Sequence, residues 1–161
     1  MLIMNTRGFD SVIKKVELYY GKVIEVTNSV AIEARMIILK RIEEGKNSSG
    51  KQMRTSSTDK YEGDIYSRRH GEDRADEGLT TSRMTLKYSG GLYNNFTYRK
   101  NYKKAKDFKF ILQFYIKNSR VKNRNITYGT LAAYHEEKQG DIFKPTKGEL
   151  NKIGKLWKKQ L

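Results

Sequence analysis

The chain of 161 residues carries a net charge of +15 at pH 7 and contains no cysteine, which excludes disulfides and thiolate metal sites. Single hydrophobic cores usually occupy about 100 to 200 residues, so we expect one domain over residues 1–161. No apolar run reaches the roughly 18 to 20 residues that a membrane span requires, and we expect a soluble protein without membrane contact. Hydrophobic residues make up only 37% of the chain, so neighbouring subunits are expected to supply part of its stability.

The first region, residues 9–44, has apolar residues at helical spacing. Gly21 and the β-branched pair Val26-Thr27 are poor helix formers and indicate an interruption. We therefore expect a short first helix, a break, and a longer helix over residues 27–44.

A long polar stretch follows at residues 45–83, where Gly, Ser, Thr and mixed charges show no sustained periodicity. Its length is far above that of an ordinary connection within a domain, so we expect a loop that is either disordered or functional. Residues 59–66 are candidates for a short strand or hairpin. Residues 68–78 are expected to be solvated, and exposure is the expected state of His70.

Two strands are predicted at residues 96–102 and 108–118, because both segments are rich in Tyr, Phe and Ile. A basic turn at residues 103–107 would join them into an antiparallel hairpin. Residues 82–88 are compatible with a further strand or with a turn of helix.

The hairpin lies in the most basic part of the chain, since residues 97–125 hold ten basic residues and one acidic residue. Lys and Arg can neutralise phosphates, and Tyr98 and Tyr102 could stack on bases. Aromatic residues in strands are more often core, however, and a Lys-rich turn is more often solvated. We favour unspecific electrostatic contact over sequence-specific recognition. The residues expected to contact DNA or an acidic partner are Arg99, Lys100, Lys103, Lys104, Lys106, Arg120, Lys122 and Arg124.

The pattern of the last third of the chain predicts two helices. We expect the first over residues 126–135 and a second, capped by Thr146, that contains Leu150 and Trp157. Pro145, the only proline, stands where this last helix would start.

No motif indicates catalysis. His135 is followed by Glu136, but the second histidine needed to place two imidazoles on one helix face for zinc is missing. A histidine at a helix end or an interface is therefore the favoured interpretation. Phosphate-cradling glycine loops and nucleophile elbows do not occur. We expect no enzyme activity, no cofactor and no metal site.

Four motifs, taken in their order and spacing, resemble the tailed-phage head-to-tail joining proteins, which are the small ring-forming neck, tail-completion and tail-terminator subunits. The motifs are Gly8-Phe9-Asp10-Ser11-Val12, Ala31-Ile32-Glu33-Ala34-Arg35, Ser89-Gly90-Gly91-Leu92, and the ending from Tyr134-His135-Glu136 to Phe143-Lys144-Pro145. The resemblance covers most of the chain apart from residues 45–81. The usual family ending has Arg before the proline and an aromatic residue after it, whereas here Phe143 precedes the proline and Thr146 follows.

The resemblance implies an α+β fold in which a long helix packs on a mainly antiparallel sheet of about four strands, with the long polar loop 45–83 inserted and a C-terminal helix. It implies a structural virion protein, made in the host cytoplasm, that forms a six-fold or twelve-fold homo-oligomeric ring in the neck or tail. That ring would join the portal or connector to the tail proteins and surround the DNA channel, and the loop 45–83 would contact a neighbouring ring. The residues assigned to subunit packing are Tyr134, His135, Phe143, Pro145 and Trp157.

The main alternative is a stand-alone basic nucleic-acid-binding protein, which the charge and the aromatic residues support. It lacks an RNA-recognition strand signature and a helix-turn-helix motif. A small hydrolase or nuclease is the third reading. A metal-dependent nuclease needs clustered carboxylates, and the acidic residues of the basic half are isolated.

Overall fold

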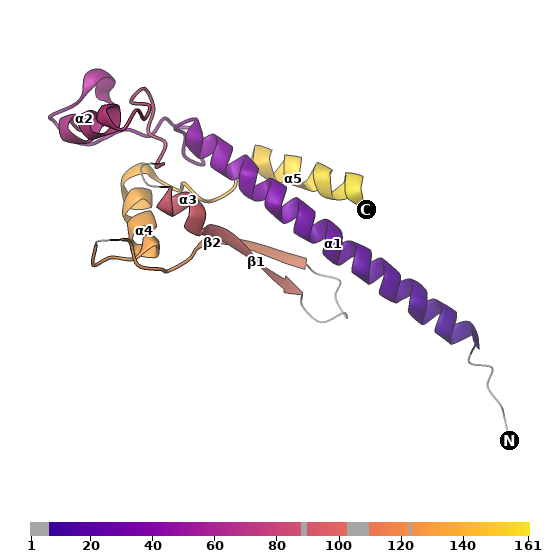
Figure 1. Cartoon of the computed structure of the whole chain (residues 1–161). Coiled ribbons are helices and arrows are strands. Elements are labelled where there is room, and N and C mark those ends of the chain that lie inside the picture. The colour runs from indigo at the N-terminus through magenta and orange to yellow at the C-terminus, as the bar shows by residue number, and fades with distance from the viewer. Residues whose placement is uncertain (1–6, 88–89, 103–109, 123) are drawn as a thin grey trace.

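The computed structural model describes residues 7–87, 90–102, 110–122 and 124–161, and its class is α+β as expected. One long helix runs along the molecule with a hairpin and a second helix beside it (Figure 1). The elements in chain order are helix α1 (Arg7–Glu43), the 3-10 helix η1 (Glu62–Asp64), helices α2 (Arg68–Asp76) and α3 (Gly91–Asn95), strands β1 (Phe96–Tyr102) and β2 (Phe110–Ile116), and helices α4 (Tyr128–Gln139) and α5 (Lys147–Gln160).

Helix α1 is continuous over 37 residues, so the expected break was wrong. Gly21 costs only about 1 kcal/mol within a helix, and the surrounding turns outweigh that cost. Val26 and Thr27 are buried, and the Thr27 hydroxyl donates a hydrogen bond to the Val23 carbonyl at 2.6 Å. Tertiary packing therefore overrides the weak local preference of these residues.

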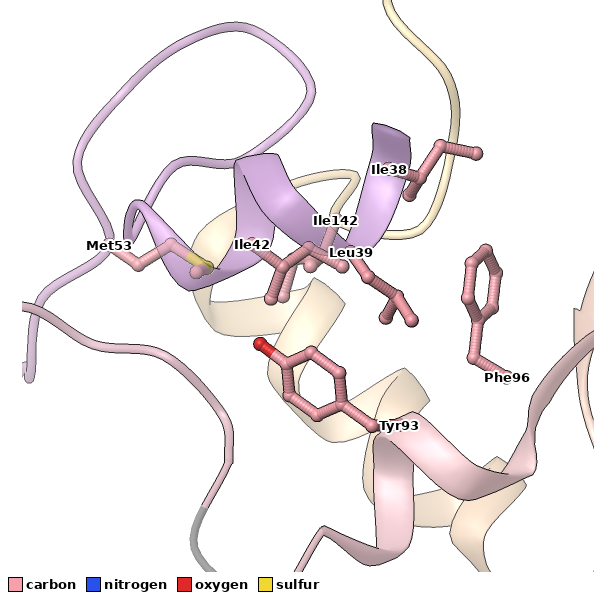
Figure 2. Close-up of a cluster of buried hydrophobic side chains, with 7 residues drawn as sticks. All are labelled: Ile38, Leu39, Ile42, Met53, Tyr93, Phe96 and Ile142. Atoms are coloured by element: carbon pink, nitrogen blue, oxygen red, sulfur yellow. The ribbon is translucent and has the colours of Figure 1, made fainter. Parts of the chain in front are cut away.

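The hydrophobic core forms where the C-terminal part of α1 meets α3 and the start of β1 (Figure 2). Its buried members are Ile38, Leu39, Ile42, Met53, Tyr93, Phe96 and Ile142. The Phe96 ring lies 5.8 Å from the Phe114 ring and 5.4 Å from the Phe143 ring, measured between centroids. These contacts attach the hairpin and the segment before α5 to the long helix.

The antiparallel hairpin is confirmed, with Phe96 opposite Ile116 and Tyr102 opposite Phe110. Within the described residues the sheet contains two strands, so the expectation of about four was wrong. Residues 59–66, the candidates for a short strand or hairpin, form no named strand but fold back as a short hairpin-like turn, with an antiparallel bridge between Lys60 and Ser67 and a hydrogen bond from the Tyr61 N–H to the Tyr66 carbonyl at 3.0 Å. Gly63 lies at a φ of 79° there, which extended strands do not allow.

The polar stretch 45–83 contains helix α2, which the sequence did not predict. Most of its side chains are exposed, as expected for residues 68–78, but Gly71 and Arg74 are buried. A Cβ atom on Gly71 would lie 2.2 Å from the Tyr61 ring, so only glycine fits at this helix contact. The stretch therefore packs on the rest of the chain at a few specific points.

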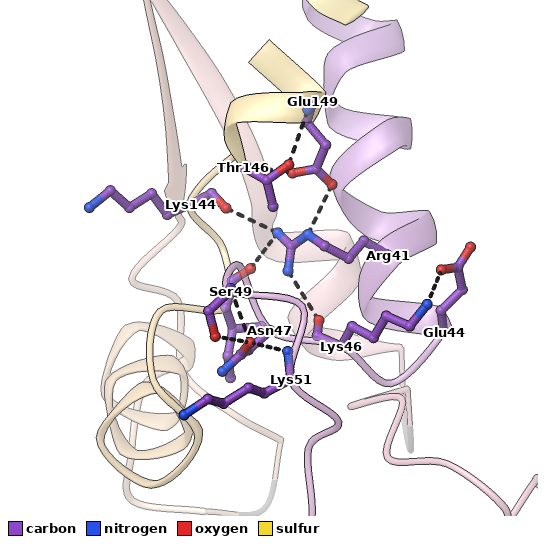
Figure 3. A network of polar contacts seen from close by, with 10 residues as sticks. Arg41, Glu44, Lys46, Asn47, Ser49, Lys51, Lys144, Thr146 and Glu149 are labelled. Atoms are coloured by element: carbon purple, nitrogen blue, oxygen red, sulfur yellow. Dashed lines mark hydrogen bonds and ion pairs between the residues drawn. The ribbon is translucent and has the colours of Figure 1, made fainter. Parts of the chain in front are cut away.

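A polar network centred on the buried Arg41 joins three segments (Figure 3). Its Nε donates to Oε1 of Glu149 at 2.9 Å. The guanidinium also donates to the carbonyls of Ile142 at 2.8 Å, Lys144 at 3.0 Å and Lys46 at 3.0 Å. A planar group with five donors can satisfy all of these acceptors at once, so Arg41 fixes the turn after α1 and the segment before α5.

Helix α5 begins with the cap that the sequence predicted. The Thr146 hydroxyl accepts a hydrogen bond from the Glu149 backbone N–H at 3.0 Å, and the Glu149 carboxylate accepts one from the Thr146 N–H at 2.7 Å. The helix then runs antiparallel to α1, and at its end the Leu161 carbonyl accepts a hydrogen bond from Lys22 Nζ at 2.8 Å. Cover by α5 therefore stops near residue 22 of α1.

Candidate functional site

The basic residues predicted for the hairpin separate onto its two faces. Arg99 is exposed, donates to Gln113 Oε1 at 2.8 Å and holds its guanidinium 5.9 Å above the Tyr115 ring. Lys100 lies on the opposite face, where its ammonium group contacts Asn28 of α1. Lys103, Lys104 and Lys106 lie outside the described residues, as does the side chain of Tyr102. Tyr98 packs edge-on against Phe114, 6.3 Å between ring centroids, which is a core-facing position.

Three further basic residues lie in the loop between β2 and α4. Arg120, Lys122 and Arg124 are exposed there. The loop is closed by a bridge between Arg120 and Thr127 and by a hydrogen bond from the Val121 N–H to the Ile126 carbonyl at 2.9 Å. These contacts hold the base of the loop next to the start of α4.

A cleft of about 660 Å³ lies between α2 and α4. From α4 it is lined by Tyr128, Leu131 and His135, whose spacing of three and four residues places them on one helix face. From α2 it is lined by His70 and Arg74, one turn apart. The two groups lie far apart in the sequence, and the fold brings them to one cleft.

The remaining lining of this cleft is apolar or basic. Met84, Leu86 and Leu92 contribute aliphatic surface, and Lys122 and Arg124 of the β2–α4 loop contribute cations. None of the described residues that line the cleft is acidic. The cleft therefore combines an apolar wall with an uncompensated positive edge.

Both histidines of the chain face this cleft. Burial lowers the pKa of His70 below its ordinary value of 6.5, and the nearby charge of Arg74 adds to the effect, while Asp73 opposes it. Burial also lowers the pKa of His135, and His70 contributes to that shift. Both imidazoles are consequently neutral at pH 7 and can act as donor and acceptor. The expected exposed state of His70 was wrong, because the residue is partly buried.

Arg74 lines the cleft and is only 1% exposed. Its Nε donates to the Thr80 carbonyl at 2.9 Å, and its Nη2 donates to the Thr85 hydroxyl at 3.3 Å. Its guanidinium also lies 4.7 Å from the centre of the Tyr66 ring, a cation–π contact. No local pattern in the sequence distinguishes this buried arginine from its solvated neighbours.

An apolar groove of about 630 Å³ runs between β2, α4 and α5. Phe143 and Pro145, both predicted to pack between subunits, contribute to it, together with Ile116, Ala132 and Leu150. Phe143 also packs against the core of its own chain. The groove thus offers a concave, mainly apolar surface beside β2.

The other residues predicted for subunit packing lie on helices α4 and α5. Tyr134 is 56% exposed and contacts the ring of His135, with 5.8 Å between centroids. Trp157 is partly buried on α5. Of these residues, Tyr134 presents the largest accessible aromatic surface.

The N-terminal part of α1 exposes apolar side chains. Val16 is 56% exposed, Tyr19 57% and Tyr20 38%. They continue the helix face that is buried from Val23 onward. Among the described elements, none lies beside this end of α1 (Figure 1).

A metal site and a membrane helix are both missing from the parts of the chain that the structure describes. There, His, Asp and Glu side chains do not gather in groups of three that could hold an ion. The described helices likewise include none with both the length and the apolarity to span a bilayer.

The chain matches no protein-family model, no curated protein and no solved structure.

Proposed function

We propose that this protein is a ring-forming neck or tail-completion subunit of a tailed bacteriophage, one that joins the portal or connector to the tail and surrounds the DNA channel. The observation that carries the proposal is the pair of exposed apolar side chains Val16 and Tyr19 on α1, which are 56% and 57% exposed. Contiguous apolar surface at the end of a long helix is typical of a contact with another protein.

The groove between β2, α4 and α5 is the surface that suits this helix in a second copy. It is apolar, and it lies on a different part of the chain from the N-terminal half of α1. A contact between two different surfaces is head-to-tail, and it closes into a ring when the rotation per subunit is an integral fraction of a turn. Six-fold and twelve-fold rings both satisfy this condition.

The exposed cations supply the second part of the proposal. Arg99 on the outer face of the hairpin, and Arg120 beyond β2, are accessible to a polyanion. A ring repeats these charges around its axis, so unspecific contact with packaged DNA or an acidic connector surface would follow. Such contact positions a partner without reading its sequence.

The test uses acidic substitutions on two faces of the same helix. Val16→Asp combined with Tyr19→Asp places charge on the apolar face, whereas Leu18→Asp places it on the opposite face, where Leu18 is 74% exposed. Light scattering of the full chain, alone and with purified connector rings, should show assembly for wild type and Leu18→Asp and its loss for the double variant.

Two results would contradict the proposal. Equal assembly of the double variant would exclude the α1 face as the contact. The alternative is a stand-alone nucleic-acid-binding protein, which the net charge of +15 favours. It would be supported if the wild-type protein stayed monomeric, did not bind connector rings, and bound DNA with an affinity that falls steeply with salt.

A further inference from the structure

We propose that the cleft between α2 and α4 is a binding site for a nucleotide, with the base against its apolar and aromatic wall and the phosphate at its basic edge. This site is separate from the α1 face and the groove that carry the proposed function. Its failure or success is therefore independent of ring assembly.

The size of the cleft fits this ligand class. Its volume of about 660 Å³ lies within the range of about 300 to 1,000 Å³ that small-molecule and cofactor sites occupy. Aliphatic side chains of Leu86, Leu92 and Leu131 and the rings of Tyr128 and the exposed Tyr134 line it. Flat apolar surfaces of this kind accept a base by stacking, independently of its sequence identity.

The charge of the cleft selects an anion. Lys122 and Arg124 are exposed at its edge, on a loop whose base is held by hydrogen bonds. The described lining contains no carboxylate to compete with an incoming phosphate. Hydrogen bonds from arginine or lysine to phosphate are among the strongest in proteins, because both partners are charged.

The two histidines give the site a response to pH. His70 and His135 both line the cleft, and the charges that act on His70 are the cations Arg74 and Arg124 and the anion Asp73. A bound phosphate favours the protonated imidazoles, so nucleotide binding should raise the pKa of both histidines. Affinity should consequently increase as the pH falls toward 6.

The experiment is calorimetric titration of the full chain with dAMP, deoxyadenosine and inorganic phosphate at about pH 7. We expect dAMP to bind at least about tenfold more tightly than either fragment, because only the nucleotide uses both the wall and the edge. A 5′-phosphorylated oligonucleotide distinguishes the source of the ligand. Binding tighter than that of dAMP assigns the site to a DNA strand end, and weaker binding assigns it to a free nucleotide.

Paired charge-reversal variants test the location. Lys122→Glu with Arg124→Glu changes two cations at the cleft, and Lys152→Glu with Lys155→Glu makes the same charge change on the exposed face of α5. We expect the first pair to weaken dAMP binding by at least about tenfold and the second to change it less than twofold. Equal losses would show that net charge alone attracts the nucleotide and would overturn the proposal.

A histidine variant tests the pH response, since His70→Gln with His135→Gln removes both imidazoles. The phosphate titrates identically in both proteins, so the difference between their pH profiles isolates the histidines. A steeper rise of affinity in the wild type supports their role. The proposed site would be overturned by any of three results. These are parallel pH profiles of the two proteins, undetectable binding of dAMP, and an affinity for deoxyadenosine equal to that for dAMP. Circular dichroism confirms that each variant is folded.

Discussion

The two ends of α1 have the same apolar periodicity and opposite surroundings. From Val23 to Ile42 the apolar face is buried against the core, the hairpin and α5. From Val16 to Tyr20 the same face is exposed. Amphipathic periodicity therefore predicts a helix with an apolar face. It does not predict whether that face packs against the same chain or against a different protein chain.

The largest expected effect comes from breaking the polar network at the covered end. Arg41→Ala leaves the buried Glu149 carboxylate without its ion-pair partner and removes donors from three carbonyls. Removing one member of a buried pair costs about 3 to 5 kcal/mol, and we expect a loss of free energy of unfolding in that range. Urea denaturation measures it. A loss under about 1 kcal/mol would show that the network does not hold the covered end.

A matched truncation compares the two ends directly. Ile38 is fully buried, so Ile38→Ala should lower the free energy of unfolding by about 2 to 5 kcal/mol. Val16→Ala removes methyl groups from an exposed position and should change it by less than about 0.5 kcal/mol. Both are measured on dilute protein by urea denaturation. Similar values for the two variants would mean that Val16 is covered in solution even at low concentration.

A smaller effect is expected at the start of α5. Thr146→Ala removes the hydroxyl that accepts from the Glu149 N–H, and such caps contribute about 0.5 to 2 kcal/mol. The end of α5 lies at Lys22 of α1, so the helix content of the residues before Lys22 should stay unchanged. Hydrogen exchange can verify both points. Faster exchange in residues 7–20 than in wild type would contradict them.

The smallest effect concerns pH, because α1 contains no histidine and both histidines lie in the body of the protein. Their pKa values are lowered from 6.5 by burial, so the unfolded chain takes up protons first as the pH falls. The free energy of unfolding should therefore decrease as the pH falls from about 7.5 to about 5.5, through the window between the unfolded and folded pKa values. His70→Gln with His135→Gln should reduce that slope in denaturation series at several pH values, and an unchanged slope would count against the assignment.

Local signals predicted local structure well. The Thr146 cap and the hairpin follow from residues close together in the sequence, and both are present. The single α1 helix was missed because burial of Val26 and Thr27, which depends on distant segments, outweighs their weak helix preference. The expectation of about four strands was wrong, because among the described residues the sheet contains only β1 and β2, and residues 59–66 fold back at Gly63 instead of extending beside the hairpin.

The cleft could not be predicted from the sequence. Arg74 sits in a solvated polar stretch, and its burial arises from contacts with Thr80, Thr85 and the Tyr66 ring. His70 and His135 are far apart in the chain and line the same cleft only in the folded protein. The charge pattern did single out Lys122 and Arg124, which now lie at the edge of the same cleft.

The ion pair between Arg41 and Glu149 spans 108 positions of sequence, and this separation has a consequence for biosynthesis. Helix α1 leaves the ribosome well before α5, so its apolar face stays uncovered while the intervening chain is translated. Contacts of such long range close late and slow folding. During that interval the nascent chain presents the kind of surface that chaperones recognise and that drives aggregation, and production at lower temperature or with added chaperones should raise the yield of folded protein.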